Sequence, residues 1–181
     1  MFKNLFLSGS ALGVLLLGAG CATDRPHHKV LATAVLSASS GSVVGGTVKF
    51  IRARQGVWVV ANFGGLSPGL HGFHIHENGD CSAPDAKSAG GHFNPMAGHH
   101  AGPDDPSRHL GDLGNLQADA SGNASYSRIF ADLTIDGEYS IIGKSIVVHA
   151  KADDLKTQPA GDSGDRIACG VIVRQWPVPQ P

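Results

Sequence analysis

The chain has 181 residues, 14 basic and 15 acidic side chains, and a formal net charge of −1. This length corresponds to one domain with a short addition. No stripe of Lys and Arg runs along the sequence, so the composition argues against a nucleic-acid-binding protein, and the balanced charge does not otherwise specify a partner.

The first 20 residues have the features of a signal peptide. Lys3 gives a positive start, and the apolar run 5–20 is shorter than the ~20 residues that cross a bilayer. The run ends in Leu-Gly-Ala-Gly before Cys21, which resembles a bacterial lipobox with Cys21 as the acylated residue. Gly18 stands where a large aliphatic residue is usual, so ordinary cleavage and release of a soluble protein is the alternative. In either case we expect the domain to leave the cytosol, with residues 21–28 as a tether.

After the tether, short apolar segments alternate with turn residues. Strands are expected at 30–36, 43–51, 57–63, 70–76, 114–119, 124–130, 145–150 and 169–174. Helical signal is nearly absent, and one or two helical turns are expected only at 131–136. This pattern predicts an all-β domain at 29–175, an eight-stranded antiparallel Greek-key barrel or sandwich with two long functional loops. A short C-terminal tail would follow at 176–181.

Two long segments lack this periodicity. Residues 77–111 are rich in Gly, Pro, Asp, Asn and His, and residues 151–167 are charged and contain Gly. A loop of about 35 residues without secondary structure is uncommon in a compact domain unless it is functional. We therefore expect a metal and a disulfide bond to order the first loop, because hydrophobic burial cannot.

Histidines are the strongest chemical signal. His74 and His76 lie two positions apart in a predicted strand, so their imidazoles project to the same side. Further residues of ligand type follow at His92, His100, His109, Asp112 and His149. Imidazole nitrogens suit copper and zinc, and a carboxylate among them favours zinc. A hydrogen-bonded or surface role is the ordinary alternative for one histidine, but it does not account for the whole series.

Two cysteines remain after the processing site. Cys81 and Cys169 are an even pair in an exported domain, which predicts a disulfide bond. The bond would close a loop of nearly ninety residues and stabilise the fold by up to about 4–5 kcal/mol in the chain-entropy model. Two thiolate metal ligands are the alternative, but no Cys-x-x-Cys spacing favours it.

Several motifs in combination resemble the copper,zinc superoxide dismutases, in particular the exported enzymes of bacteria. They are Gly72-Phe73-His74-Ile75-His76-Glu77, Gly91-His92-Phe93-Asn94-Pro95, His109-Leu110-Gly111-Asp112-Leu113-Gly114-Asn115, Ile146-Val147-Val148-His149 and Arg166-Ile167-Ala168-Cys169-Gly170. The resemblance covers about residues 30–174. It implies copper ligands at His74, His76, His92 and His149, and zinc ligands at His92, His100, His109 and Asp112. His92 would bridge the two metals, and the family spacing selects His100 rather than its neighbour His99.

The resemblance also implies roles for residues around the metals. Asp153 corresponds to a carboxylate that accepts hydrogen bonds from His74 and His100, with an exposed loop acid as the alternative. Arg166 corresponds to the arginine beside the copper channel, where a permanently charged guanidinium would attract the superoxide anion. An ordinary surface arginine is the alternative. Arg166 and His92 are therefore the expected catalytic residues.

The activity implied is dismutation of superoxide to oxygen and hydrogen peroxide, with copper cycling between copper(II) and copper(I) while zinc fixes His92. The enzyme would protect the cell envelope, in the periplasm or anchored to a membrane through acylated Cys21. A module that binds or delivers copper or zinc in the envelope is the alternative, although it would not need Arg166 or a bridging histidine. A structural sandwich that metals merely stabilise is a third possibility. Relatives include monomers and homodimers with different interfaces, so both states remain open.

Overall fold

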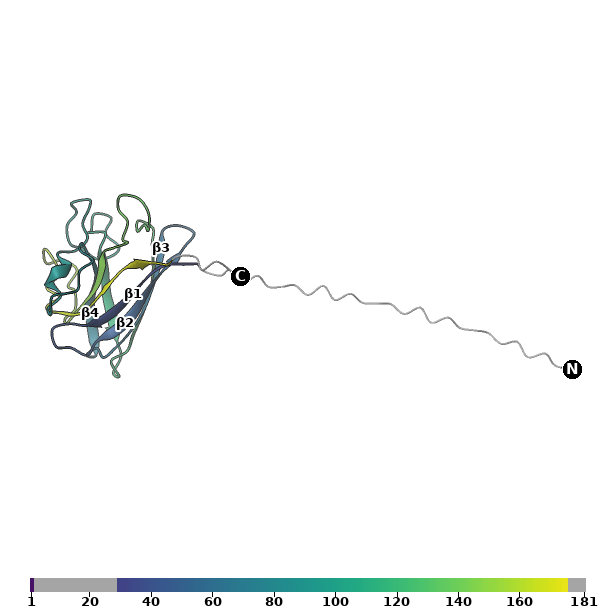
Figure 1. Cartoon of the computed structure of the whole chain (residues 1–181), viewed down its shortest axis with the longest axis horizontal. Coiled ribbons are helices and arrows are strands. Elements are labelled where there is room, and N and C mark those ends of the chain that lie inside the picture. The colour runs from purple at the N-terminus through teal and green to yellow at the C-terminus, as the bar shows by residue number, and fades with distance from the viewer. Residues whose placement is uncertain (2–28, 176–181) are drawn as a thin grey trace.

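The computed structural model describes Met1 and residues 29–175. The predicted signal peptide, the tether with Cys21 and the C-terminal tail fall at 2–28 and 176–181, outside the described residues. Within the described part, no helix is long and apolar enough to span a membrane. Strands dominate this part of the chain and curl around one core (Figure 1).

The strands follow the predicted segments closely. In chain order they are β1 (Val30–Ala38), β2 (Gly45–Arg52), β3 (Val57–Gly64), β4 (Gly69–His76), β5 (Asp112–Ala118), β6 (Ala124–Phe130), β7 (Ser145–His149), β8 (Arg166–Val171) and β9 (Val173–Arg174). A short 3-10 helix, η1 (Lys87–Ala89), is the one helix among the described residues.

The sheet closes on itself. Its strand order is β2-β3-β6-β5-β4-β7-β8-β1-β9. Because β1 also pairs with β2, the two edges of the sheet are joined and the sheet forms a barrel. Every pairing is antiparallel. Strands β8 and β9 both pair with β1 and are interrupted only at Ile172, so they occupy one position in the barrel. The predicted eight-stranded antiparallel barrel is confirmed.

Aromatic rings fill the part of the barrel next to the metal-ligand strand β4. Phe73 of β4 lies edge-on to Phe63, with 5.8 Å between ring centroids, and to Tyr126, with 5.1 Å. Such pairs contribute about 0.5–1.5 kcal/mol beyond simple burial. The Tyr126 hydroxyl donates to the Leu113 carbonyl at 2.8 Å. Strands β5 and β6 pair only at Ala118 and Ala124, next to the turn that connects them. Farther from the turn, the hydrogen bond of Tyr126 joins the two strands.

Strand β4 is buried on both sides, and this positions the candidate site. Phe73 and Ile75 belong to the barrel core. His74 and His76 point to the opposite side of the strand, yet they are also buried, because the loops on either side of the site cover them. His74 contacts Asp153 from the second loop, and His76 contacts the Gly90 carbonyl from the first.

The disulfide bond predicted from the cysteine count is present. Cys81 and Cys169 are bonded, with 5.7 Å between their Cα atoms. Around the bond, Ala86 and Ala89 of the first loop pack against Val147 of β7, outside the main core. The disulfide and this small cluster therefore fasten the loop to the outer side of β7 and β8.

Two predictions about local structure are wrong. Residues 131–136 form no helical turn. Leu133 and Ile135 are both buried, an alternation that suits extended backbone, and Thr134 forms an isolated bridge with Ser140. The last predicted strand, 169–174, begins earlier, at Arg166, because Arg166 pairs with His149 across a bulge.

Candidate metal centre

Six histidines and one aspartate gather on the outer side of β4, under the two loops. They form two groups, and within each group one potential ligand atom per residue lies within 4.8 Å of the others. The first group is His74, His76, His92 and His149, and the second is His92, His100, His109 and Asp112. These are the two sets that the sequence motifs predict, and His92 belongs to both.

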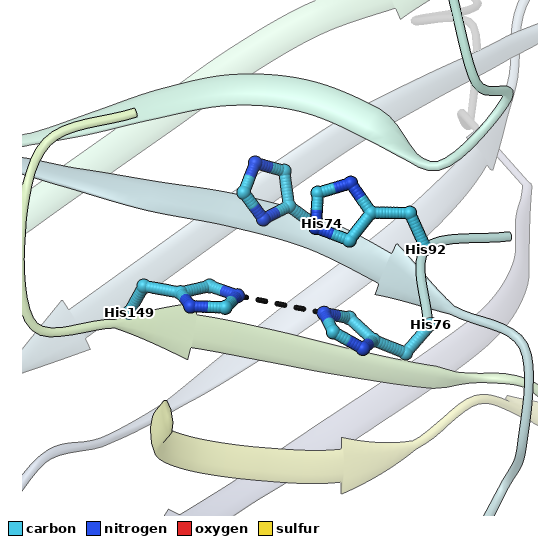
Figure 2. A group of neighbouring side chains, drawn as sticks. All are labelled: His74, His76, His92 and His149. Carbon is cyan, nitrogen blue, oxygen red and sulfur yellow. Dashed lines mark hydrogen bonds between the residues drawn. The ribbon is translucent and has the colours of Figure 1, made fainter. Parts of the chain in front are cut away.

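The first group is built mainly on strands. His74 and His76 come from β4 and His149 from the adjacent strand β7, whereas His92 reaches in from the first loop and forms an isolated bridge with His76. Figure 2 shows the four imidazoles gathered around a common space. The Nε2 atoms of His76 and His149 are 3.4 Å apart across it.

Backbone carbonyls select which nitrogen faces this space. His76 Nδ1 donates to the Gly90 carbonyl at 2.9 Å, and His149 Nδ1 donates to the Gly164 carbonyl at 3.1 Å. The Nε2 lone pairs of both rings are thereby directed inward, as metal ligation requires.

The first group is electrostatically suited to neutral imidazoles. Burial, and next the neighbouring imidazole of His92, lower the pKa of His74 and His76 well below the ordinary value. Burial also lowers the pKa of His149 to about 4. Neutral imidazole is the form that binds metal, so the fold holds these rings ready for a cation.

The second group converges on one carboxylate. Asp112 Oδ1 lies 2.7 Å from His92 Nδ1, 3.0 Å from His100 Nδ1 and 3.4 Å from His109 Nδ1. Its other oxygen accepts the backbone N–H groups of Ala101 and His109, each at 3.1 Å. Burial opposes ionisation of this carboxyl, but hydrogen bonds from His100 and His92 prevail and hold the pKa of Asp112 well below its usual range.

Unpartnered nitrogens test whether metals fit these groups. His74 Nδ1, His92 Nε2 and His109 Nδ1 are buried and have no hydrogen-bond partner in the structure. A buried polar atom without a partner costs about 1–3 kcal/mol, so such atoms are rare unless something else binds them. All three belong to the two groups. Four imidazoles suit copper, and three imidazoles with one carboxylate form a closed zinc site, so the donors present fit both metals.

Asp153 links the two groups through hydrogen bonds to one histidine of each. Its Oδ2 accepts from His74 Nε2 at 2.8 Å and its Oδ1 accepts from His100 Nε2 at 2.9 Å, with both carboxylate and rings fully buried. This is the position expected for Asp153 from the sequence. Burial lowers the pKa of His100, but Asp112 and Asp153 outweigh it and raise that pKa to about 9.

Sequence reasoning missed two polar residues that hold this arrangement. The Asn115 amide forms reciprocal bonds with the backbone of Asp153, at 2.7 Å and 2.9 Å. Arg108, 6% exposed, donates from Nε to the Asp112 carbonyl at 3.2 Å and from Nη1 and Nη2 to the Asp132 carboxylate at 2.6 Å and 3.1 Å. The only sequence signal is that Arg108 directly precedes the motif that carries His109 and Asp112, and that Asn115 is the last residue of that motif.

Arg166 lies at the open side of the first group. Its Nη1 donates to the Ala86 carbonyl at 2.8 Å and its Nη2 to the Gly90 carbonyl at 2.7 Å, so the first loop fixes the guanidinium. A cavity of about 280 Å³ is lined by Arg166 together with His76, His92, His149, Pro159 and Ala160. The cavity gives a small anion a route to the imidazoles past a fixed positive charge.

Gly90 has a double role at this point. Its carbonyl accepts from both Arg166 and His76. Its backbone is left-handed, with φ of 74°, and a Cβ atom at this position would lie 2.6 Å from Glu77 Oε1. A residue other than glycine would therefore strain the backbone and clash with Glu77.

His99 stays outside both groups. Its side chain is 55% exposed, and its Nε2 lies 3.4 Å from Asp105 Oδ2. The adjacent His100 is fully buried between two carboxylates. This difference agrees with the choice of His100 over His99 from sequence spacing.

Comparisons with known proteins agree with the fold and the donor sets. The family model described as copper/zinc superoxide dismutase (SODC) matches residues 44–172. The extracellular superoxide dismutase [Cu-Zn] of Caenorhabditis elegans is 38% identical over 169 residues, which cover 88% of this chain and 76% of that protein. The crystal structure of the clock protein EA4 superposes with a TM-score of 0.72 at 38% identity, covering 80% of this chain and 94% of that chain. The chain thus belongs to the copper/zinc superoxide dismutase family and is an oxidoreductase that dismutates superoxide with copper and zinc as its cofactors.

Proposed function

We propose that superoxide reacts in the cavity between Arg166 and the first histidine group, and that the enzyme works outside the cytosol. The observation that carries the site assignment is the position of His92, which belongs to both ligand groups. A protein that only buffers one metal has no need for such a shared imidazole.

The proposed copper ligands are the four nitrogens that face the first group. They are His74 Nδ1 and the Nε2 atoms of His76, His92 and His149. The proposed zinc ligands are the Nδ1 atoms of His92, His100 and His109 with Asp112 Oδ1. When bound, copper supplies the one-electron redox chemistry, and zinc, which has none, fixes the shared imidazole.

Arg166 is proposed to bind and orient the substrate. Its guanidinium is held by two carbonyls and remains charged at every physiological pH. A fixed cation at the wall of a small cavity attracts an anion even when the total charge is slightly negative. Superoxide would therefore be drawn into the cavity that Arg166 lines together with His92 and His149.

His92 is proposed to hold and deliver a proton. The overall reaction consumes two superoxide anions and two protons and yields one oxygen and one hydrogen peroxide. His92 lines the cavity and its Nε2 has no hydrogen-bond partner, so this nitrogen can carry a proton. His92 Nδ1, as a proposed zinc ligand beside Asp112, would keep the ring oriented while Nε2 gains or loses the proton.

Export is proposed on three grounds. The N-terminal sequence has signal-peptide features, the domain contains a disulfide bond, and the related enzyme from Caenorhabditis elegans is named extracellular. The finer proposal is a cell-envelope enzyme anchored through acylated Cys21. Labelling with a radioactive fatty acid should mark the wild type and not the Cys21→Ser variant, and label that persists in the variant would refute the anchor.

The neighbours His99 and His100 give a matched test of the site. In protein loaded with copper and zinc, His100→Ala should lose zinc, while His99→Ala should keep both metals and full dismutase activity. Metal content is measured by mass spectrometry and activity by a superoxide consumption assay. A wild type that carries both metals and does not consume superoxide would overturn the proposed site.

A further inference from the structure

Gln158 makes a reciprocal pair of hydrogen bonds with the backbone of His100. The His100 N–H donates to Gln158 Oε1 at 2.8 Å, and Gln158 Nε2 donates to the His100 carbonyl at 2.7 Å. The same Nε2 also donates to the Lys156 carbonyl at 3.1 Å. One side-chain amide therefore fixes both backbone groups of a fully buried histidine that is 58 residues away in the sequence.

The residues that follow Gln158 form part of the wall of the substrate cavity. Pro159 and Ala160 line the cavity together with Arg166 and with three members of the first histidine group, His76, His92 and His149. The side chain of Gln158 thus contacts the second ligand group, while the chain that continues from it borders the first. Among the described residues of the 151–167 loop, only Gln158 hydrogen-bonds to the backbone of His100.

We propose that Gln158 is a positioning residue that couples zinc binding at His100 to the placement of the Pro159–Ala160 wall of the cavity. The inference rests on the proposed role of His100 as a zinc ligand. Two bonds to one backbone unit restrict its rotation, so the imidazole of His100 keeps its direction toward Asp112. The coupling is reciprocal, so a cation that fixes His100 also fixes the wall.

Zinc release from the holoenzyme tests the first half of the coupling. Gln158→Met keeps the side-chain length and removes both bonds, and zinc transfer to a chelator should become faster by about 10-fold. The matched control is Thr157→Val, which removes an exposed bond to Asp154 in the same loop and should leave zinc release unchanged. With cobalt(II) in place of zinc, the visible spectrum should shift in Gln158→Met and not in Thr157→Val.

Hydrogen exchange tests the second half. The Gly161 amide bonds to the Thr157 carbonyl at 2.7 Å and reports on the order of the wall. Adding zinc to the metal-free protein should slow exchange at Ala160 and Gly161 in the wild type and should have little effect there in Gln158→Met. Equal protection by zinc in both proteins would refute the coupling.

A second variant and a reference keep the outcome interpretable. If Gln158→Met folds poorly, Gln158→Glu retains an acceptor for the His100 N–H, loses the donor, and should give a smaller acceleration. His100→Ala is the reference for loss of the ligand itself. If His100→Ala leaves zinc release unchanged, the proposed zinc role is wrong. If it accelerates release and both Gln158 variants do not, only the coupling is wrong.

Discussion

The two ligand groups are held by different parts of the molecule. Three of the four histidines of the first group lie on β4 and β7, adjacent strands with a fixed antiparallel register. In the second group, His92, His100 and His109 come from the first loop and only Asp112 begins a strand. A barrel thus holds the proposed copper side, whereas side-chain bonds and a disulfide hold the proposed zinc side.

This contrast teaches that the copper side can keep its geometry without its metal, while the zinc side depends on contacts made over long sequence distances. Local stability varies across a fold, and loop segments with few apolar contacts open most easily. The first loop, about 35 residues long, contributes few buried apolar residues: Phe93 and Leu110 to the main core, and Ala86 and Ala89 to the small cluster under the disulfide. We expect perturbations of the loop to affect the zinc side first.

The largest effect should come from removing the disulfide. The double variant Cys81→Ala with Cys169→Ala should lower the free energy of unfolding by up to about 4 kcal/mol, because the bond closes a loop with a sequence separation of 88 residues. Urea unfolding measures the loss, and zinc should leave at a lower urea concentration than copper. Release of copper before zinc would show that the proposed copper side, and not the proposed zinc side, is the less stable of the two.

Next in size is the effect of removing a strand-borne ligand. His149→Ala should lower dismutase activity by more than about 100-fold, since an imidazole of the proposed copper site is lost. The zinc content should remain close to that of the wild type, because His149 is not a member of the second group. Loss of zinc in this variant would show that the two sides are not independently held.

A smaller effect is expected from the cavity cation. Arg166→Ala should lower the rate of superoxide consumption by about 10-fold or more and weaken its dependence on ionic strength, since attraction of the anion is lost. Both metals should stay bound, and Arg166→Lys should restore part of the rate. An unchanged salt dependence would mean that Arg166 does not attract the substrate.

The smallest effect is expected in the pH dependence of the free energy of unfolding of the metal-free protein. His149 of the proposed copper side should lower this free energy at acidic pH and His100 of the proposed zinc side at alkaline pH, each by about 1–3 kcal/mol. The pKa of His149 is lowered to about 4, so the stability that it contributes is lost as pH falls from about 6.5 toward 4. The pKa of His100 is raised to about 9, so its contribution is complete below about 6.5 and is lost as pH rises through 9. Urea midpoints from pH 4 to 9 measure both limbs. His100→Gln should flatten only the alkaline limb.

Much of the fold followed from the sequence, because strand periodicity and turn residues are local signals. The grouping of the metal ligands also followed, because the motifs in combination resemble those of the copper,zinc superoxide dismutases and that resemblance implies both ligand sets. The helical turns predicted at 131–136 were wrong, because the burial of Leu133 and Ile135 in the barrel decides the backbone there. Local propensity in a short segment does not reveal which neighbours will cover it.

Apart from Asp153, the residues that support the ligands could not be predicted in this way. Asn115 contacts Asp153 across 38 residues and Gln158 contacts His100 across 58. Asn115 lies in strand β5 and Gln158 in the second loop, so the partner of each amide is set by how the second loop folds over the barrel and the first loop. The roles assigned to the metal ligands, Asp153 and Arg166 stay predictions that the variants above test.

The bonds made by the carbonyl of Gly90 limit which substitutions this position can tolerate. An alanine at Gly90 would displace one oxygen that serves both His76 and Arg166, and would meet Glu77 as well. An alanine at the neighbouring Gly91 would meet only an ordinary van der Waals contact. In a saturation library of this loop, active clones should therefore retain glycine at 90 while position 91 diversifies, so two adjacent identical residues would differ sharply in mutational tolerance.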